Sequence, residues 1–225
     1  MKTTKMKKMM RFKFIVGSLI FLTISSLSAQ TDQKAKLLLD KLSAKTKAYT
    51  SIKANFNYIL ENKAEGLNEV QSGWIVLKGD KFILEIAGQE ILSDGATIWT
   101  YLKDAEEVQI TDVEEDNEDQ ISPGSIFTLY ESGYRHEYKK DETSGGINYA
   151  IIYIYPLDLD EKSFHTIQLY IDKDKIELKK IIILSKEGDN YTYKIKSFQT
   201  NIPINDSDFV FQKSKYPDVE IVDLR

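Results

Sequence analysis

The strongest constraint on the fold is an alternation between apolar and other residues over positions 72–102. Phe82, Leu84 and Ile86 occupy one face of this pattern, because successive side chains of a strand point to opposite faces. The dipeptide Asp94-Gly95 interrupts the alternation and is typical of a type I′ hairpin turn. The stretch therefore predicts four consecutive antiparallel strands, with an apolar face that another element must cover.

The same strand pattern recurs along most of the chain. A first alternating strand begins at Ile52, and further strand patterns lie at residues 107–111, 134–139, 148–155, 164–171, 177–184, 191–199 and 209–211. Turn-rich segments separate these strands, without a linker or repeat that would divide the chain. This regular spacing predicts one antiparallel sheet of about eleven strands that curls on itself.

Two helices are expected against this sheet. Apolar residues at helical spacing predict an amphipathic helix between residues 31 and 50, with Leu39 and Leu42 on its apolar side. Ser122-Pro123 is a favoured helix start, and a short apolar helix is expected to follow it. An inserted helix of this kind covers an open end of a sheet, so Phe127 and Tyr130 should point at whatever lies beneath. The predicted fold class is α+β.

The N-terminus has the pattern of a secretory signal peptide. Residues 1–13 hold six basic and no acidic side chains, residues 14–24 are apolar and uncharged, and small residues follow. This apolar run is too short to be read as a spanning helix. We expect cleavage after Ala29 and one exported domain at residues 30–225, with a retained N-terminal anchor as the alternative.

Composition narrows the possible partners. Cleavage removes six of the 30 basic side chains and leaves 24 against 35 acidic ones, a formal net charge of −11. This sign argues against nucleic acid and against an anionic membrane surface as partners. Because the chain has no cysteine, we expect neither disulfides nor a lipid-bearing cysteine, so the core alone must hold the fold.

Residues that carry enzymatic chemistry are scarce. The chain has two histidines, His136 and His165, and no Gly-x-Ser-x-Gly sequence or phosphate-binding glycine loop. We expect no enzyme, no metal site and no cofactor, although a pair of carboxylates acting as acid and base stays open. The run 112–119, with six acidic residues of eight, is interpreted as a solvated loop, with a docking patch or a cation contact as the alternative.

Residues 73–101 resemble the core signature of the LolA family, the periplasmic lipoprotein carriers of Gram-negative bacteria. Lys78-Gly79-Asp80-Lys81-Phe82 matches the turn into an aromatic strand start, and Ser93-Asp94-Gly95 with Trp99 and Tyr101 matches the next motif. The order of helix, first long strand, Ser122-Pro123 helix and C-terminal aromatic strand extends the resemblance over nearly the whole mature chain. This variant resembles the form found in Bacteroidetes-type bacteria.

The resemblance implies an incomplete antiparallel barrel lidded by helices, in which an apolar cavity shields the acyl chains of lipoproteins between the inner and outer membranes. It implies acylated lipoproteins and the inner-membrane ABC-type release complex as partners, with an outer-membrane acceptor that is unknown. We expect the protein to be a monomer. Where the family carries arginine near the end of the second strand, this chain has Lys78. Lys78 is therefore the candidate latch of the lid, although lysine lacks the planar donor fork of arginine.

The predicted cavity lining joins apolar sheet residues to residues of the two helices: Leu39, Leu42, Trp74, Val76, Phe82, Leu84, Ile86, Trp99, Tyr101, Phe127 and Tyr130. Ordinary core packing is the alternative role for each of these side chains. Two other functions stay open. One is a binding protein for a free lipid or another small hydrophobe, and the other is a sensor or regulatory module of the same half-barrel, which would be expected to carry a second domain.

Overall fold

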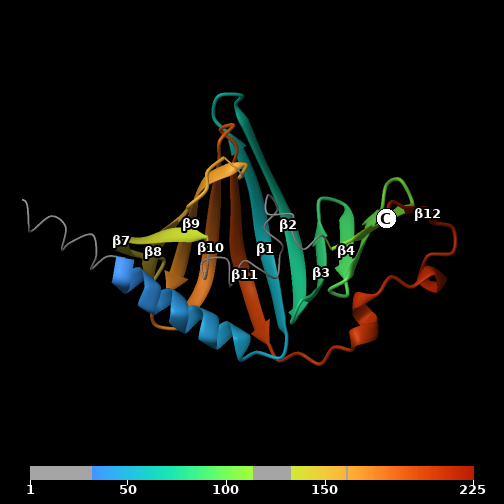
Figure 1. Ribbon diagram of the computed structural model, residues 1–225, viewed down its shortest axis with the longest axis horizontal. Coiled ribbons are helices and arrows are strands. Elements are labelled where there is room, and N and C mark those ends of the chain that lie inside the picture. Colours follow the sequence, from blue (N-terminus) through green and yellow to red (C-terminus); the bar gives the residue numbers. More distant parts are fainter. Residues whose placement is uncertain (1–31, 114–132, 161) are drawn as a thin grey trace, which may run out of the picture.

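The computed structural model describes residues 32–113, 133–160 and 162–225, which form one α-helix and one large sheet (Figure 1). The twelve strands of these residues lie in the order β12-β6-β5-β4-β3-β2-β1-β11-β10-β9-β8-β7. Neighbours are antiparallel, except that β12 pairs with β6 in parallel. The end strands β7 and β12 lie at opposite edges, so the sheet is open. The predicted incomplete antiparallel barrel is confirmed as this open sheet.

The strand bounds follow the sequence pattern closely. In chain order they are β1 (Ile52–Asn62), β2 (Leu67–Lys78), β3 (Lys81–Ile86), β4 (Gln89–Ser93), β5 (Thr97–Leu102), β6 (Glu107–Asp112), β7 (Tyr134–Ser144), β8 (Ile147–Pro156), β9 (Phe164–Asp172), β10 (Glu177–Ser185), β11 (Asn190–Thr200) and β12 (Glu220–Asp223). The alternating stretch over residues 72–102 forms the end of β2 and all of β3, β4 and β5. The prediction of four consecutive antiparallel strands there is confirmed.

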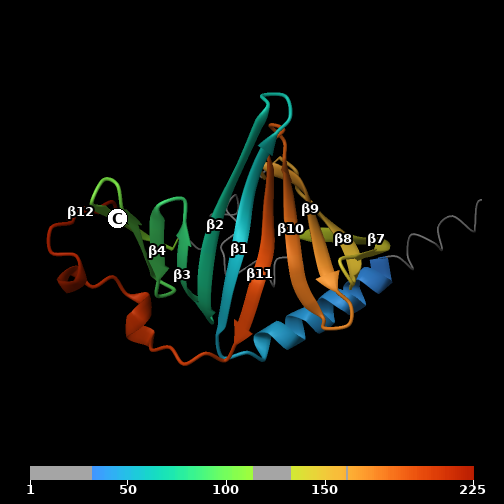
Figure 2. The same ribbon diagram turned by 180° about the vertical axis from the view of Figure 1, so that it is seen from behind.

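The N-terminal helix covers one face of the sheet. It extends over residues 32–47 and lies in front of strands β8 to β10 in Figure 1, whereas these strands lie in front of it in Figure 2. Ala35 and Leu39 are 0% exposed and Leu42 is 3% exposed, within the same apolar cluster as Ile152 of β8 and Leu169 of β9. The predicted amphipathic helix is therefore confirmed. Within the described residues, no helix is both long and apolar enough to cross a membrane.

The C-terminal segment covers part of the other face. Residues 201–219, here named the C-terminal strap, contain two short 3₁₀-helices, η3 (Asp206–Phe209) and η4 (Lys213–Lys215). The strand predicted at residues 209–211 is wrong. The Asn205 amide donates to the Asp208 carboxylate over 2.9 Å, and the chain turns there, so that Phe209 is completely buried.

The hairpin between β4 and β5 forms one residue later than predicted. The Asp94 amide donates to the carbonyl of Thr97 over 3.4 Å, which leaves Gly95 and Ala96 as the two central turn residues. Gly95 has a φ of +94°, whereas Asp94 and Ala96 are not in the positive-φ region that a type I′ turn requires at both central positions. The Asp94 carboxylate instead accepts the amides of Ala96 and Thr97, each over 2.9 Å. The predicted type I′ turn at Asp94-Gly95 is therefore wrong, although the hairpin itself forms.

Several predictions fall on residues outside the described ranges. These are the signal peptide at residues 1–29, the inserted helix that begins at Ser122, its cavity residues Phe127 and Tyr130, and the acidic run 112–119 beyond residue 113.

Candidate functional site

The sheet has two apolar faces that are covered by different elements. We name the side that packs against the N-terminal helix the helix face and the other side the opposite face. Strand register assigns each residue to a side: Leu77 pairs with Phe82 on the helix face, and Val76 pairs with Ile83 on the opposite face. The apolar clusters of the two faces are separate, so a side chain can contribute to only one of them.

Part of the predicted cavity lining lies on the helix face. Leu39 and Leu42 of the helix and Phe82 of β3 are buried in its cluster, and Leu84 packs against that cluster while partly exposed. Ile86 follows at the same strand spacing and is also half-buried. The structure therefore brings these five predicted residues to one side of the sheet.

The remaining described members of the predicted lining lie on the opposite face. Trp74, Val76 and Trp99 belong to the cluster beneath the C-terminal strap. The ring of Tyr101 packs against Tyr216 of the strap, with centroids 4.9 Å apart. The physical reason is the two-residue turn between β2 and β3, because pairing Lys78 with Lys81 places even-numbered residues of β2 beside odd-numbered residues of β3. One cavity cannot be lined by both sets.

Lys78 points to the opposite face as well, and its partners belong to the C-terminal strap. Its ammonium nitrogen lies 2.7 Å from Asp206 Oδ1 and donates to the carbonyl of Ile204 over 3.2 Å. Lys81 lies 2.9 Å from the other oxygen of the same carboxylate. The hydrogen bonds from Lys78 and then Lys81 lower the pKa of Asp206 to about 2. Lys78 thus fastens the strap, a different element from the helix that it was expected to latch.

Beyond the helix, the helix face continues as an aromatic cluster that the predicted lining did not include. Phe56 and Tyr58 of β1 face Tyr191 and Tyr193 of β11; the Tyr58 and Tyr193 rings are 5.4 Å apart, and the Tyr58 and Tyr191 rings stack at 6.3 Å. Burial raises the pKa of Tyr193 to about 12. Strand alternation was the signal that could have found this cluster, because it places Phe56 and Tyr58 on one face of β1 and Tyr191 and Tyr193 on one face of β11.

A glycine makes room for this cluster. Gly73 of β2 pairs with Phe56 of β1, and a side-chain carbon at Gly73 would lie 2.7 Å from the Phe56 ring and 2.6 Å from the carbonyl oxygen of Glu85. Both distances are far below ordinary contact. The Phe56 ring therefore occupies space that the side-chain carbon of any other residue at position 73 would need.

Charged and aromatic contacts fasten the first turns of the helix. The Lys34 ammonium lies 3.5 Å above the Tyr138 ring and 3.5 Å from Asp141. The Tyr138 hydroxyl and the Lys173 ammonium also donate to Asp141, over 2.5 Å and 2.7 Å. The bonds from Lys173 and Tyr138 lower the pKa of Asp141 to about 2, whereas burial and then Asp141 raise the pKa of Tyr138.

The other end of the helix has a charged contact and a backbone joint. Lys45 donates to the carbonyl of Lys175 over 2.5 Å. The Thr50 amide donates to the Asn201 side chain over 2.9 Å, and the Asn201 amide donates to the carbonyl of Ser51 over 2.8 Å. This joint fixes the chain where the helix ends and β1 begins. Because exposed ion pairs contribute little, the helix between its ends is held mainly by apolar packing.

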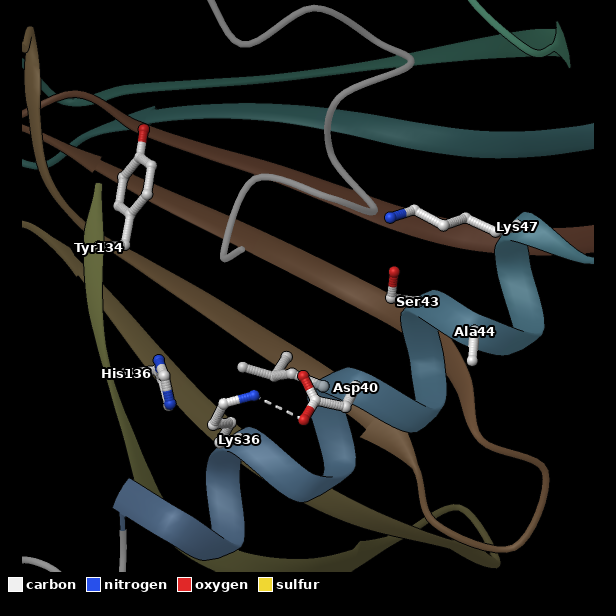
Figure 3. Close-up of a pocket in the computed structure, with 8 residues that line it drawn as sticks. Lys36, Asp40, Ser43, Ala44, Lys47, Tyr134 and His136 are labelled. Atoms are coloured by element: carbon white, nitrogen blue, oxygen red, sulfur yellow. Dashed lines mark hydrogen bonds and ion pairs between the residues drawn. The ribbon is translucent and has the colours of Figure 1, made fainter. Parts of the chain in front are cut away.

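A pocket of about 440 Å³ lies between the helix and β7 (Figure 3). Its lining is Lys36, Leu39, Asp40, Ser43, Ala44 and Lys47 of the helix, with Tyr134 and His136 of β7. Lys36 and Asp40 form an ion pair of 2.7 Å across the helix surface. His136 Nδ1 is buried and has no hydrogen-bond partner within the described part of the chain. The lining combines charged and polar groups with the apolar Leu39 and Ala44, and the pocket lies where the helix meets the edge strand β7.

The described residues hold no cluster of potential metal ligands. Over residues 32–113, 133–160 and 162–225, no three His, Asp or Glu side chains are grouped to hold a metal ion. What the helix face offers is an apolar surface with aromatic groups at one end and an amphipathic helix over the other. Such a surface can shield a hydrophobic ligand from water.

Comparison with known proteins identifies the chain's relatives. The sequence model of the family described as "Outer membrane lipoprotein carrier protein LolA" matches residues 24–189. No curated protein matches the chain significantly.

Solved structures resemble the chain at low sequence identity. An uncharacterized conserved protein from Thermus thermophilus is 14% identical with a TM-score of 0.55, covering 84% of this chain and 99% of that one. A LolA superfamily protein from Nitrosomonas europaea is 13% identical with a TM-score of 0.43 (79% and 97%). The lipoprotein LppX from Mycobacterium tuberculosis is 16% identical with a TM-score of 0.45 (76% and 98%).

Proposed function

The chain belongs to the LolA family of outer membrane lipoprotein carriers, and from this premise we propose that it shields the acyl chains of lipoproteins and carries them to the outer membrane. The observation that carries the proposal is the helix face. There an amphipathic helix buries Leu39 and Leu42 on an apolar sheet whose surface continues beyond the helix as half-buried side chains such as Leu84 and Ile91. The family is one of carriers, not of enzymes.

The energetics of acyl burial require a cover that competes with cargo. Three acyl chains hold about 45 methylenes, and at about 0.8 kcal/mol each their burial would release about 35 kcal/mol. Non-covalent affinity has a practical limit of about 20 kcal/mol, and a carrier that bound so tightly would never release its cargo. In our proposal the cargo displaces the helix, and the loss of the helix packing lowers the net affinity.

The described contacts suit a cover that lifts. The helix is joined to β1 at Ser51 and Asn201, whereas its far end has an ion pair between the exposed side chains of Lys34 and Asp141. Contacts of this kind exchange readily with water. Lifting would expose the helix-face cluster while the joint at Ser51 keeps the helix attached.

The family is periplasmic, and the proposal places this chain there. We propose that residues 1–29 are removed as a signal peptide and that residues 30–225 act as one carrier domain. Its partners would be acylated lipoproteins and an inner-membrane ABC-type release complex.

A charge placed on the helix face tests the proposal. Leu84→Glu should abolish lipoprotein uptake from inner-membrane vesicles, because a carboxylate would meet the acyl chains, while the protein stays soluble and folded by circular dichroism. Val70→Glu is the matched control, since Val70 is 61% exposed and lies on the opposite face. Full transfer by Leu84→Glu would contradict the proposal.

A carrier of free lipid would use the same face. Mass spectrometry of the protein purified from the periplasm separates the two functions: covalently acylated protein supports lipoprotein carriage, and free phospholipid or fatty acid supports the alternative.

A further inference from the structure

Four tyrosines lie together on the opposite face of β8 and β9, away from the C-terminal strap. They are Tyr149, Tyr153 and Tyr155 of β8 and Tyr170 of β9, and all are half-buried. Tyr149 meets Tyr170 edge-on at 6.1 Å, and Tyr153 meets Tyr155 at 6.3 Å. In Figure 2, strands β9 and β10 lie in front of the helix, so this surface faces the viewer.

Basic side chains lie over these rings. The Lys180 ammonium is 3.4 Å from the centroid of Tyr170, the Arg135 guanidinium is 4.3 Å from that of Tyr155, and the Lys139 ammonium is 5.1 Å from that of Tyr153. We name this surface the tyrosine–lysine face: the four tyrosines with Arg135, Lys139, Lys140, Lys180 and Lys194.

The carboxylates within the tyrosine–lysine face are already paired. Glu137 lies 2.8 Å from Lys139, and Glu142 lies 2.6 Å from Lys140. At the turn between β9 and β10, Glu177 lies 2.7 Å from Lys179, and the buried Asp172 accepts hydrogen bonds from the amides of residues 174 and 175. Arg135 shares Glu137 at 3.8 Å. The five basic groups of this surface against Glu137 and Glu142 give it a positive character, although the formal net charge of residues 30–225 is −11.

Two lysines on this surface oppose each other directly. Lys180 of β10 and Lys194 of β11 are register partners on adjacent strands, and like charges in that position repel each other. An anion placed between or above them would relieve the repulsion. The pair is thus an independent sign that the surface accommodates negative charge.

We propose that the tyrosine–lysine face is a docking surface for an anionic phospholipid bilayer. The tyrosines combine an apolar ring with a polar hydroxyl, which suits the headgroup level of a membrane. Lysine and arginine extend their charges over the rings toward phosphate groups. The overall negative charge does not prevent docking, because charges more than about 8 Å away are largely screened at physiological ionic strength.

An exposed leucine at the margin favours a bilayer over an acidic polypeptide. Leu157 directly follows β8 and is 72% exposed, and its amide continues the pairing with β7 by donating to the carbonyl of Gly133 over 3.0 Å. Strand alternation then places Leu157 on the same side as Tyr155. A side chain so exposed gains from contact with the acyl boundary of a membrane and gains little from an acidic peptide.

Vesicle binding tests the docking surface. The full mature chain is sedimented with vesicles of phosphatidylcholine alone or with 30% phosphatidylglycerol, in 50 mM and 500 mM salt. We expect binding to the anionic vesicles only, and its loss at high salt. Because each basic group near an anionic surface strengthens binding about fivefold, Lys180→Glu combined with Lys194→Glu should weaken binding by at least about twentyfold.

The matched control carries the same charge change elsewhere. Lys41→Glu combined with Lys215→Glu changes two exposed lysines, one on the helix and one in the strap, and should bind nearly as the unchanged protein does. Equal weakening in both double variants, equal binding to the two kinds of vesicle, or no vesicle binding would overturn the proposal. Retention on poly-glutamate without vesicle binding would assign the surface to acidic polypeptides and overturn it as well.

Discussion

Replacing Leu39 by alanine tests whether the helix competes with cargo. Leu39 is 0% exposed within the helix-face cluster, and such a replacement destabilises a protein by about 2–5 kcal/mol. If cargo displaces the helix, this packing is already lost in the loaded state. The replacement then weakens only the empty, closed state.

The expected result has two opposite parts. The free energy of unfolding of the empty protein should fall by about 3 kcal/mol, a value within that range. Affinity for a triacylated lipopeptide should rise by up to about 150-fold. Binding competes with the empty, closed state, so the free energy that the closed state loses is added to the free energy of binding. A rise in affinity from a destabilising core mutation is not expected if Leu39 only lines a fixed cavity.

Urea unfolding and fluorescence titration with a labelled triacylated lipopeptide measure the two quantities. Leu92→Ala is the matched control, because Leu92 is 7% exposed in the other cluster, on the opposite face. It should destabilise the protein and leave affinity unchanged. If Leu39→Ala lowers stability and leaves affinity unchanged or weaker, the helix does not move aside and the reasoning is refuted.

Two further predictions concern contacts at either end of the helix face. Gly73→Ala should lower the free energy of unfolding by about 1–3 kcal/mol, because the added carbon meets the Phe56 ring; an unchanged urea midpoint would contradict this close packing. Lys173 and Tyr138 hold the pKa of Asp141 at about 2, below its ordinary 3.8. Its contribution to stability should therefore be complete above pH 4 and disappear as the pH falls through 2. Asp141→Asn should unfold at lower urea than the unchanged protein at pH 6, and the difference in urea midpoint should shrink as the pH falls to 2 and below; a constant difference would refute the assignment. Half of that side chain is exposed, so the effect is small.

Local patterns in the sequence predicted β1 to β11 and the N-terminal helix, but they missed β12 and placed a strand at residues 209–211, which form no strand. Alternation identified β1 to β5 and placed Phe82 and Leu84 on the same face of β3, because a period of two residues is a property of the strand itself. Helical spacing identified the buried side of the helix at Leu39 and Leu42 for the same kind of reason.

The assignment of Trp74, Val76, Trp99 and Tyr101 to one cavity with Phe82 needed register, which the apolar pattern does not contain. Both sides of β2 and β3 are apolar, so alternation alone does not show which side of one strand meets which side of the next. The two-residue turn at Gly79 was the only local signal of register. Phe209, which packs on the opposite face of β2 to β4, lies more than 100 residues further along the chain. The turn at Asn205 brings it into this contact.

Site-specific photo-crosslinking to an acylated lipoprotein tests most directly whether cargo binds the helix face. A photoreactive phenylalanine derivative is placed at Leu84 on the helix face or at Trp99 on the opposite face, and the purified protein is loaded with lipoprotein and irradiated. We predict a crosslink from position 84 that is lost with non-acylated lipoprotein, and none from position 99. A crosslink from position 99 alone, or one from position 84 that does not require acylation, would contradict the central claim.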